Sequence, residues 1–560
     1  MAMPWVLRAA VLLLAEGQDC EDAPISLLQR RGQRVEDNLS SDSIARLLWL
    51  TDLHGDPFYL TSVRQCQKRT VEELQGFSFG FMGCDPPFGL MGSAAAAARS
   101  FTEADAEFVL YTGDFSRHRM LMMEDTYTNV SNIIGSVAGI IKGHFKNLPN
   151  LFGALGNDDN PANYFQNITT DQATNPWFRS VSASMQRANC MSNETRQQYD
   201  YGSFFEAQYG NLTILSIATV IYSVQHQPSS PSGLPTDPFR QLAWLRRKLG
   251  EAFEEDRRVW IVGHIPPGME TFGYTQLWHP QYLEAYLEIV QDPELGSVIA
   301  AQLFGHVHKE EIRLLPDPPP NAGPILLSAS LSPVYYNQPA FRSVSYDRNT
   351  GDALDFDTFY ANVSSKSNLD WAQGYSFTDL FQTSLTMTGL KQLAGLLLKG
   401  GEMWDKYTKW YTTTYPNDLM GVGSPRGPLP ADQESYRLLR RHQYVCALTI
   451  RTASSYQDCV TAAVRATWTP KTRDESLGAA GGFSPDIGRL VASIPLDFEE
   501  GHVLALGKLL RWAELSPREE ARQIVRLARH GEWHELLHTF GPAVDKAWEM
   551  GIPLDEALER

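Results

Sequence analysis

The chain has little cysteine, no long apolar run and a deficit of basic residues. Six cysteines in 560 residues are too few for a disulfide-built scaffold, although they suit a few bridges in an oxidising compartment. No run of eighteen apolar residues occurs, so the sequence predicts no transmembrane anchor. With 48 Lys and Arg against 65 Asp and Glu, the formal net charge is −17, which argues against nucleic acid as a partner. The oligomeric state does not follow from the composition.

Most of the chain is predicted to form one large α/β domain. Its length exceeds that of an ordinary single domain, and a hydrophobic content of 43% provides a sizeable core. Strands and helices are expected to alternate from residue 47 to about residue 359, which is typical of layered α/β folds. A linker rich in Gly and Pro, residues 469–485, introduces a C-terminal tail. A capping box at residues 516–519 and an apolar stripe that includes Ile524 and Leu527 predict helices in that tail.

Five short signals lie between residues 52 and 308, and each ends on a side chain that can ligate a metal ion. They are Asp52-Leu53-His54, Gly113-Asp114, Gly156-Asn157, Gly263-His264 and Gly305-His306-Val307-His308. Each signal on its own is typical of a surface turn. Their occurrence together predicts a common site that binds metal ions.

Four of the signals follow short apolar runs that are typical of buried strands. The runs are residues 47–50, 108–111, 259–262 and 299–304. Ligands just beyond the carboxyl ends of strands lie where open α/β sheets form their sites. Glycine readily adopts a positive φ angle, so the glycines that begin four of the signals fit tight turns from strand to loop.

The residue types favour a pair of divalent cations. Carboxylates can bridge two metal ions, while neutral imidazoles and an amide oxygen complete the coordination without adding negative charge. Two cations about 3.5–4 Å apart can activate a water molecule and hold the phosphoryl oxygens of an in-line displacement. The signals together therefore indicate a two-metal phosphoesterase site.

On these residues the chain resembles the calcineurin-like metallophosphoesterases and, among them, the acid sphingomyelinase-like phosphodiesterases. The resemblance runs from about residue 47 to about residue 464. Local matches add to it: Gly83-Cys84-Asp85-Pro86-Pro87, His118 four residues after Asp114, and Gly263-His264-Ile265-Pro266-Pro267-Gly268. It implies a four-layer αββα sandwich with C-terminal helical additions. The saposin-like domain that precedes the catalytic domain in acid sphingomyelinase has no counterpart here, so the chain resembles the saposin-less branch.

The resemblance also assigns the site. It implies that one ion is held by Asp52, His54 and His308, the other by Asn157, His264 and His306, and that Asp114 bridges the two. Zinc is the implied ion, and imidazole-rich ligation agrees with it, although iron and manganese are compatible with the same donors. A phosphodiester or phosphoanhydride would then be hydrolysed by a metal-bound hydroxide.

One position departs from the family pattern. Most members read Gly-Asn-His, and that histidine is taken to protonate the leaving group, whereas this chain reads Gly156-Asn157-Asp158. Asp158 and His118 are therefore the candidate catalytic residues. An aspartate with an ordinary pKa of about 3.9 is ionised at neutral pH. We expect that Asp158 is not the acid, and that His118 or the metal ions alone assist the leaving group.

Alternatives for the substrate and the function stay open. A phosphodiester, a nucleotide, a phospholipid head group and a polyphosphate all offer the same phosphoryl group to the metal ions. The endopolyphosphatases also resemble the chain and also lack the histidine, so an endopolyphosphatase-like hydrolase is one alternative. A non-catalytic metal- or lipid-binding relative is the other, although decay of function usually erodes ligands, and this ligand set is complete.

The sequence divides into four predicted parts. Residues 1–18 form a signal peptide, residues 44–360 the metallophosphoesterase domain, residues 361–466 the family's C-terminal helical subdomain, and residues 487–560 an extra helical module without an assigned role.

Several features predict a secreted protein or one of the lysosome or vacuole lumen. The apolar run of residues 9–15 follows Arg8 and fits a short signal peptide cleaved after Ala15, with an ordinary N-terminal helix as the alternative. Acceptor sequences for N-glycosylation occur at Asn38, Asn129, Asn167, Asn193, Asn211 and Asn362. The family resemblance pairs Cys66 with Cys84 and Cys446 with Cys459, and it leaves Cys20 and Cys190 open.

Overall fold

The computed structural model describes residues 43–61, 66, 69–102, 106–120, 125–168, 175–188, 190–227, 233–271, 274–363, 369–416, 433–467, 523, 524, 526, 527, 536, 539 and 540. The predicted signal peptide, Cys20 and the predicted linker at residues 469–485 lie outside these ranges.

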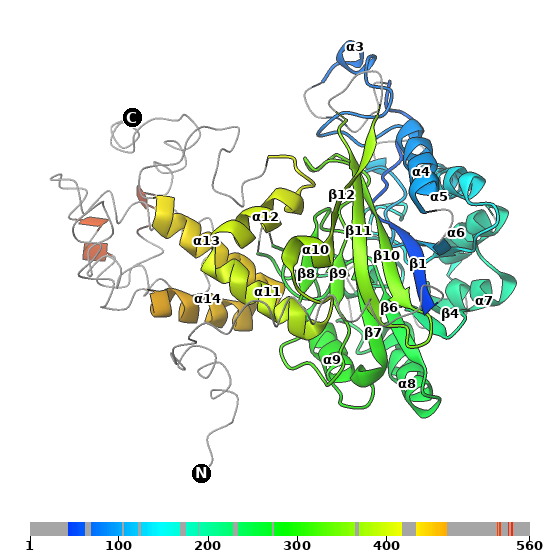
Figure 1. The fold of residues 1–560 in the computed structure, drawn as a ribbon. Helices are drawn as coiled ribbons and strands as arrows, with labels where there is room; N and C mark the ends of the chain where they lie inside the picture. The colour runs from blue at the N-terminus through cyan, green and yellow to red at the C-terminus, as the bar shows by residue number, and fades with distance from the viewer. Residues whose placement is uncertain are drawn as a thin grey trace. The chain divides into compact units, whose positions relative to one another are not determined.

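The first sheet has six strands in the order β12-β11-β10-β1-β2-β3. Figure 1 shows β12, β11, β10 and β1 of this sheet. Its strands β1 (Ile44–Leu50), β2 (Ala106–Tyr111) and β3 (Asn150–Phe152) are parallel. Parallel neighbours need crossover connections, and these contain α4 (Phe88–Thr102) and α5 (Thr126–His144). On the other side of β1, the strands β10 (Ala340–Asp347), β11 (Ala353–Ala361) and β12 (Trp371–Ser376) are antiparallel.

The second sheet also has six strands, in the order β4-β5-β6-β7-β9-β8. The strands β5 (Leu212–Ser216), β6 (Arg258–Val262), β7 (Ile299–Phe304) and β9 (Ile325–Leu327) are parallel, and β4 (Phe205–Tyr209) and β8 (Glu311–Arg313) are antiparallel edges. The helices α8 (Gln241–Glu254) and α9 (Pro280–Val290) provide crossovers. Both sheets are therefore mixed, and each places several strand ends at one edge.

The four apolar runs of the sequence form β1, β2, β6 and β7, and their residues are buried, as predicted. Rings from the two sheets meet: Phe108 stacks on Tyr209 with 4.3 Å between ring centroids, and Trp260 meets Tyr346 edge-on at 5.6 Å. Helix α4 packs on β1 and β10, and α8 packs on β6. Strands covered in this way are continuously apolar. The predicted layered α/β fold is confirmed.

The remaining helices and turns lie between the strands or, from α10 onward, follow the last strand β12. They are α3 (Val71–Leu74), α6 (Pro176–Arg187), α7 (Asn193–Gly202), α10 (Phe377–Phe381), α11 (Met387–Lys399), α12 (Glu402–Tyr411), α13 (Gln433–Leu448) and α14 (Ala453–Thr467), with 3₁₀ turns η3 (Val220–Tyr222), η4 (Pro238–Arg240) and η5 (Gly296–Val298). Within the described ranges, no helix combines the length and the apolar character that crossing a membrane requires.

The chain divides into two compact units. The first comprises Met1–Pro428 with Arg440–Tyr456 and contains both sheets, and the second comprises Leu429–Leu439 with Gln457–Arg560. In the second, Ile524 and Leu527 are helical and buried, as expected for an apolar helix stripe. The predicted boundary at residue 360 falls within the first sheet, because β12 pairs with β11.

The cysteines fall into different states. Cys66 and Cys84 form the expected disulfide, and Cys446 and Cys459 are both disulfide-bonded. Cys190 is a free, buried cysteine, and burial raises the pKa of its thiol to about 12.

Candidate metal centre

The side chains of the five signals meet at the carboxyl ends of strands from both sheets. Asp52 and His54 follow β1, Asp114 follows β2, and Asn157 lies in the loop after β3. His264 follows β6, and His306 and His308 follow β7. All seven residues that the sequence predicted as metal ligands therefore come from loops at strand ends.

Five of the seven predicted ligands have a left-handed backbone. The φ angles are 49° at Asp52, 45° at His54, 55° at Asp114, 72° at His306 and 61° at His308. Non-glycine residues in this region are strained, and such strain is concentrated at functional sites. The fold therefore maintains an unfavourable backbone to aim these side chains.

Three of the four glycines of the signals do not have the predicted positive φ angle. Only Gly113 has a positive φ angle, 94°, so the prediction is wrong for Gly156, Gly263 and Gly305. At Gly156 a Cβ atom would lie 2.0 Å from Asp114 Oδ1, and at Gly305 it would lie 2.1 Å from Thr51 Oγ1. These two glycines are required because other loops approach the backbone too closely for a side chain.

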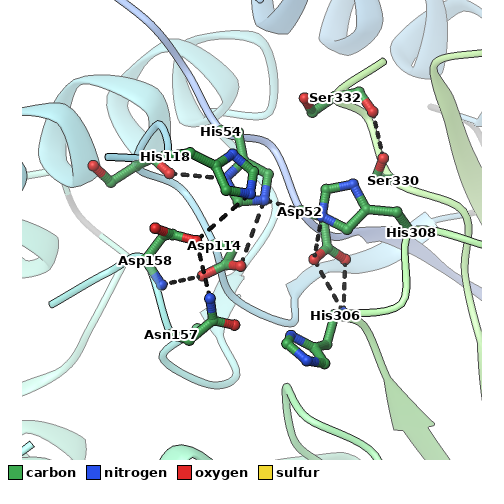
Figure 2. A network of polar contacts seen from close by, with 12 residues as sticks. Asp52, His54, Asp114, His118, Asn157, Asp158, His306, His308, Ser330 and Ser332 are labelled. Atoms are coloured by element: carbon green, nitrogen blue, oxygen red, sulfur yellow. Dashed lines mark hydrogen bonds and ion pairs between the residues drawn. The ribbon is translucent and has the colours of Figure 1, made fainter. Parts of the chain in front are cut away.

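One group of possible metal donors consists of Asp52, His54, Asp114 and His308, all buried. His54 Nε2 lies 3.1 Å from His308 Nε2 and 3.4 Å from Asp114 Oδ2. His308 Nε2 lies 3.3 Å from Asp52 Oδ1. Four donor atoms from three loops thus point to one place (Figure 2).

A second group consists of Asp114, His264 and His306. His264 Nε2 lies 3.2 Å from Asp114 Oδ2 and 3.2 Å from the amide oxygen of Asn157. The same carboxylate oxygen of Asp114 therefore faces both groups. The buried Asp and His residues fit a dinuclear metal site.

Hydrogen bonds at the far side of the rings test this fit. His54 Nδ1 lies 2.9 Å from the carbonyl oxygen of Ser116, and His264 Nδ1 lies 2.7 Å from that of Thr112. A carbonyl only accepts, so Nδ1 carries the proton in both rings. In a neutral imidazole this leaves the lone pair of Nε2 directed into the cluster, as in metal-ligating histidines.

The buried carboxylates of this cluster also favour the binding of cations. Burial lowers the pKa of His54 to about 4, which keeps this ring neutral. Burial raises the pKa of Asp52 to about 7, and the nearby Asp114 carboxylate adds to this effect. Burial lowers the pKa of His264, but the Asp114 carboxylate outweighs it and raises the value to about 10. Buried carboxylates are costly unless positive charge or metal coordination compensates them.

The carboxylate of Asp159 connects the loops after β2 and β3. It accepts hydrogen bonds from the backbone N–H groups of Asp114 and Phe115, both at 2.7 Å, and of Ser116 and Gly156, both at 3.0 Å. Its carbonyl accepts from the indole N–H of Trp177 in α6 at 3.1 Å. Asp159 therefore holds the strained turn of Asp114 in place. No pattern in the sequence predicts this role.

His118 lies beside the first donor group, and its ring stacks on that of His54 with 4.0 Å between centroids. Asp85 accepts from its backbone N–H at 2.8 Å and lies 2.9 Å from Nδ1. Its Nε2 lies 3.2 Å from the hydroxyl of Tyr335 and 3.6 Å from Asp158 Oδ2. Burial lowers the pKa of His118, but Asp85 and Asp158 outweigh this effect and raise it to about 10.

Two of these neighbours were missing from the predicted site. Asp85 belongs to the Gly83–Pro87 motif, so its family match was the available signal for it. Tyr335 had no signal in the sequence, and half of its surface is exposed. It follows β9 in the chain, and its ring contacts that of His308 edge-on at 4.7 Å.

Asp158 is buried and engaged on two sides. Its backbone N–H donates to Asp114 Oδ1 at 2.8 Å, and its Oδ2 accepts from the amide of Asn157 at 2.9 Å (Figure 2). Burial raises the pKa of its carboxyl well above the usual range, and His118 acts in the opposite direction. Asp158 thus lies beside the two donor groups, and His118 forms a third group of possible metal donors with His54 and His308.

Comparison with known proteins confirms the resemblance to the acid sphingomyelinase-like phosphodiesterases. Sphingomyelinase phosphodiesterase D of Dictyostelium discoideum is 25% identical over 352 residues, which cover 61% of this chain and 76% of that protein. The cyclic GMP-AMP phosphodiesterase SMPDL3A of Rattus norvegicus is 25% identical over 443 residues, 75% of this chain and 92% of the relative. The human acid sphingomyelinase-like phosphodiesterase 3b is 26% identical and covers 59% of this chain and 75% of the relative.

No family model matches the chain. A dimetal phosphatase from Danio rerio aligns with 56% of this chain and 95% of its own at 12% identity and a TM-score of 0.32.

Proposed function

We propose that this chain is a dinuclear-metal phosphodiesterase of the acid sphingomyelinase-like type, which hydrolyses a phosphodiester or a phosphoanhydride. The observation that carries the proposal is the convergence of two donor groups, buried except for the half-buried His306, on one oxygen of Asp114. The sequence relatives support it, because the chain matches phosphodiesterases over most of their length.

The donors divide naturally between two cations. In the proposal, Asp52, His54 and His308 hold one ion, Asn157, His264 and His306 hold the other, and Asp114 bridges them. Four imidazoles favour zinc among the divalent ions. When bound, such a pair lowers the pKa of a water molecule and polarises the phosphoryl oxygens.

The residues beside the donor groups orient the substrate and handle a proton. Asp85 fixes the ring of His118 through Nδ1, so Nε2 is the atom available to the leaving group. The His118 side chain is 12% exposed, whereas the Asp158 side chain is 4% exposed and bound to the Asn157 amide. We therefore assign proton transfer at the leaving oxygen to His118 Nε2 rather than to Asp158.

A second candidate function is favoured by Asp158 itself. Phosphate leaving groups have low pKa values and need little protonation, so an endopolyphosphatase-like activity tolerates a carboxylate at this position. A hydrolysis panel separates the candidates: sphingomyelin, a cyclic dinucleotide, a nucleotide, polyphosphate and an activated aryl phosphodiester, each at acidic and neutral pH.

The panel also tests the class of the protein. We expect turnover of at least one substrate, loss of turnover on chelation and recovery with zinc. A chain that holds two metal ions and hydrolyses no substrate would instead be a binding relative without catalytic activity.

For the compartment we propose secretion or a lysosomal or vacuolar lumen. The Cys66–Cys84 disulfide supports an oxidising environment, and the glycosylation acceptors Asn193 and Asn211 are exposed. Peptide mapping of protein from a secretory host should find glycans there and a new N-terminus near Ala15. An unglycosylated chain that retains Met1 and carries reduced Cys66 and Cys84 would contradict the proposal.

A further inference from the structure

The amide of Asn157 has two chemically different ends, and only one of them is a metal ligand. Its Nδ2 lies 2.9 Å from Asp158 Oδ2 and 2.9 Å from the side-chain oxygen of Asn163. Its Oδ1 lies 3.2 Å from His264 Nε2, in the second donor group. Both amide hydrogens are thus directed away from the site.

The partner at residue 158 determines this orientation. The Asn157 NH₂ group lies between two acceptor oxygens, Asp158 Oδ2 and Asn163 Oδ1, so the amide oxygen is left to face His264. A reversed amide would place oxygen against carboxylate and direct N–H groups at the cation. Asn163 reinforces the same orientation through its side-chain oxygen.

The backbone of Asp158 orients the carboxylate of Asp114. The N–H of Asp158 donates to Asp114 Oδ1 at 2.8 Å. The other oxygen, Oδ2, is the one that lies 3.4 Å from His54 Nε2 and 3.2 Å from His264 Nε2. Asp158 therefore contacts the non-ligand end of both side chains that offer an oxygen to the second ion, Asn157 Nδ2 and Asp114 Oδ1, although its own carboxylate belongs to neither donor group.

We propose that Asp158 is a positioning residue, which turns the oxygen of Asn157 toward the ion held by Asn157, His264 and His306. This inference rests on the proposed dinuclear site. It assigns a role in metal binding to the residue that stands where the family has its leaving-group histidine. Residues that orient metal ligands typically contribute about 10–100-fold to metal affinity.

Zinc titrations of the full-length protein against a competing chelator test the proposal, because they measure the two affinities separately. In Asp158→Ala, we expect the affinity of one ion to fall by about 10–100-fold and that of the other to stay unchanged. In Asp158→Asn, the amide oxygen still accepts from Asn157, so both affinities should stay near those of the wild type. Equal losses in the two variants would overturn the proposal, because they would show that only the negative charge matters.

The same titrations in an Asn157→Asp variant separate the effect of amide orientation from that of charge more directly. Asn157→Asp replaces the amide by a carboxylate whose two ends are equivalent, so no orientation is required. In that background, Asp158→Ala should cost no affinity relative to Asn157→Asp alone. If Asp158→Ala weakens the ion equally in the wild-type and in the Asn157→Asp background, Asp158 acts by general attraction, and the proposal is wrong.

Asn163 is exposed, so we expect Asn163→Ala to fold even if the variants at buried positions do not. It removes one of the two acceptors of the Asn157 amide, and we expect a loss of about five-fold for the same ion, the value of one hydrogen bond. Unchanged affinity in Asn163→Ala together with unchanged affinity in Asp158→Ala would overturn the proposal. These titrations do not depend on hydrolysis. A wild-type protein that binds two ions but hydrolyses no substrate would therefore refute only the proposed function, and not the role of Asp158.

Discussion

Two clusters of buried charge lie in the same unit of the chain, and they are organised in opposite ways. In the metal centre, two carboxylates and four imidazoles place their donor atoms close to one another. The other cluster, which we call the ion-pair cluster, consists of Glu310, Glu311, Arg313 and Arg342, and all four residues are buried.

In the ion-pair cluster each charge has a partner of opposite sign. Arg342 pairs with Glu310, which also accepts from the hydroxyl of Tyr375 at 3.1 Å. Arg313 Nη2 lies 2.8 Å from Glu311 Oε2, and its Nη1 donates to two backbone carbonyls at 2.7 Å. The formal charges cancel, so this cluster needs no ligand.

The comparison shows that burial of charge alone does not mark a functional site. The ion-pair cluster is balanced in charge although Arg313 Nε and Arg342 Nε and Nη1 have no hydrogen-bond partner among the described residues. In the metal centre, by contrast, the imidazole nitrogens and carboxylate oxygens of several residues face one another. The informative feature is therefore whether the imidazole nitrogens and carboxylate oxygens of several residues point to one place. Substitutions in the two clusters should therefore have different effects. Those in the metal centre should reduce bound metal and turnover, whereas those in the ion-pair cluster should reduce the free energy of unfolding.

The largest effect is expected at the bridging residue. Asp114→Asn removes a negative charge shared by both ions, so the purified variant should lose bound metal and more activity than the roughly 100-fold typical of residues that only support ligands. Elemental analysis and a turnover assay measure both quantities. Asp355→Asn, the same exchange at a half-buried carboxyl of β11, is the matched control and should keep both. Two ions per chain in Asp114→Asn would refute the bridge.

His118 should matter for turnover and not for metal. His118→Ala should lose about 10²–10⁴-fold in kcat on a substrate with an alkoxide leaving group, because a positioned proton donor is removed. On an aryl phosphodiester, whose leaving group needs no proton, the loss should be small. Equal losses on both substrates, or a loss of bound zinc, would show that His118 supports the site in another way.

The ion-pair cluster should respond to substitution in its stability. Arg342→Met leaves Glu310 buried without its partner, so the free energy of unfolding should fall by about 3–5 kcal/mol. Replacing both residues, with Arg342→Met and Glu310→Leu, should recover most of this loss because no charge is left uncompensated. Denaturant unfolding measures both variants. A double variant as unstable as the single one would mean that packing, rather than charge balance, holds this region.

The smallest effect concerns pH and a carboxyl that belongs to neither cluster. Burial raises the pKa of Asp355 to about 6, although Thr378 donates to it from its backbone and hydroxyl. The folded chain therefore binds this proton more tightly than the unfolded chain. The associated stability is present below about pH 3.9 and is lost as the pH rises through 6. Asp355→Asn should flatten the stability profile between pH 4 and 7 by roughly 1–2 kcal/mol; parallel profiles would contradict this assignment.

The sequence predicted the parts of the site that depend on local pattern. Apolar runs followed by Asp or His placed four strands and six of the seven predicted ligands, because the carboxyl ends of strands gather at sheet edges. The signal that contains Asn157 follows no such run. Asp159 was not assigned its role, because its partners are backbone N–H groups of a loop more than 40 residues away. No sequence pattern records which backbone groups a carboxylate accepts from.

The ion-pair cluster shows the same limit. Glu310 precedes β8 of the second sheet and Arg342 lies in β10 of the first. Their pairing depends on how the two sheets pack, and this is fixed by tertiary contacts rather than by spacing in the chain. The sequence could therefore predict a metal site from its donors, whereas it could not predict which distant residues balance or orient one another.

The most direct test of the dinuclear centre is the anomalous diffraction of zinc in crystals of the zinc-loaded protein. The account predicts two peaks about 3.5–4 Å apart, both in contact with the carboxylate of Asp114, one beside His54 and His308 and the other beside His264 and His306. A single peak, or two peaks of which one does not touch Asp114, would contradict it.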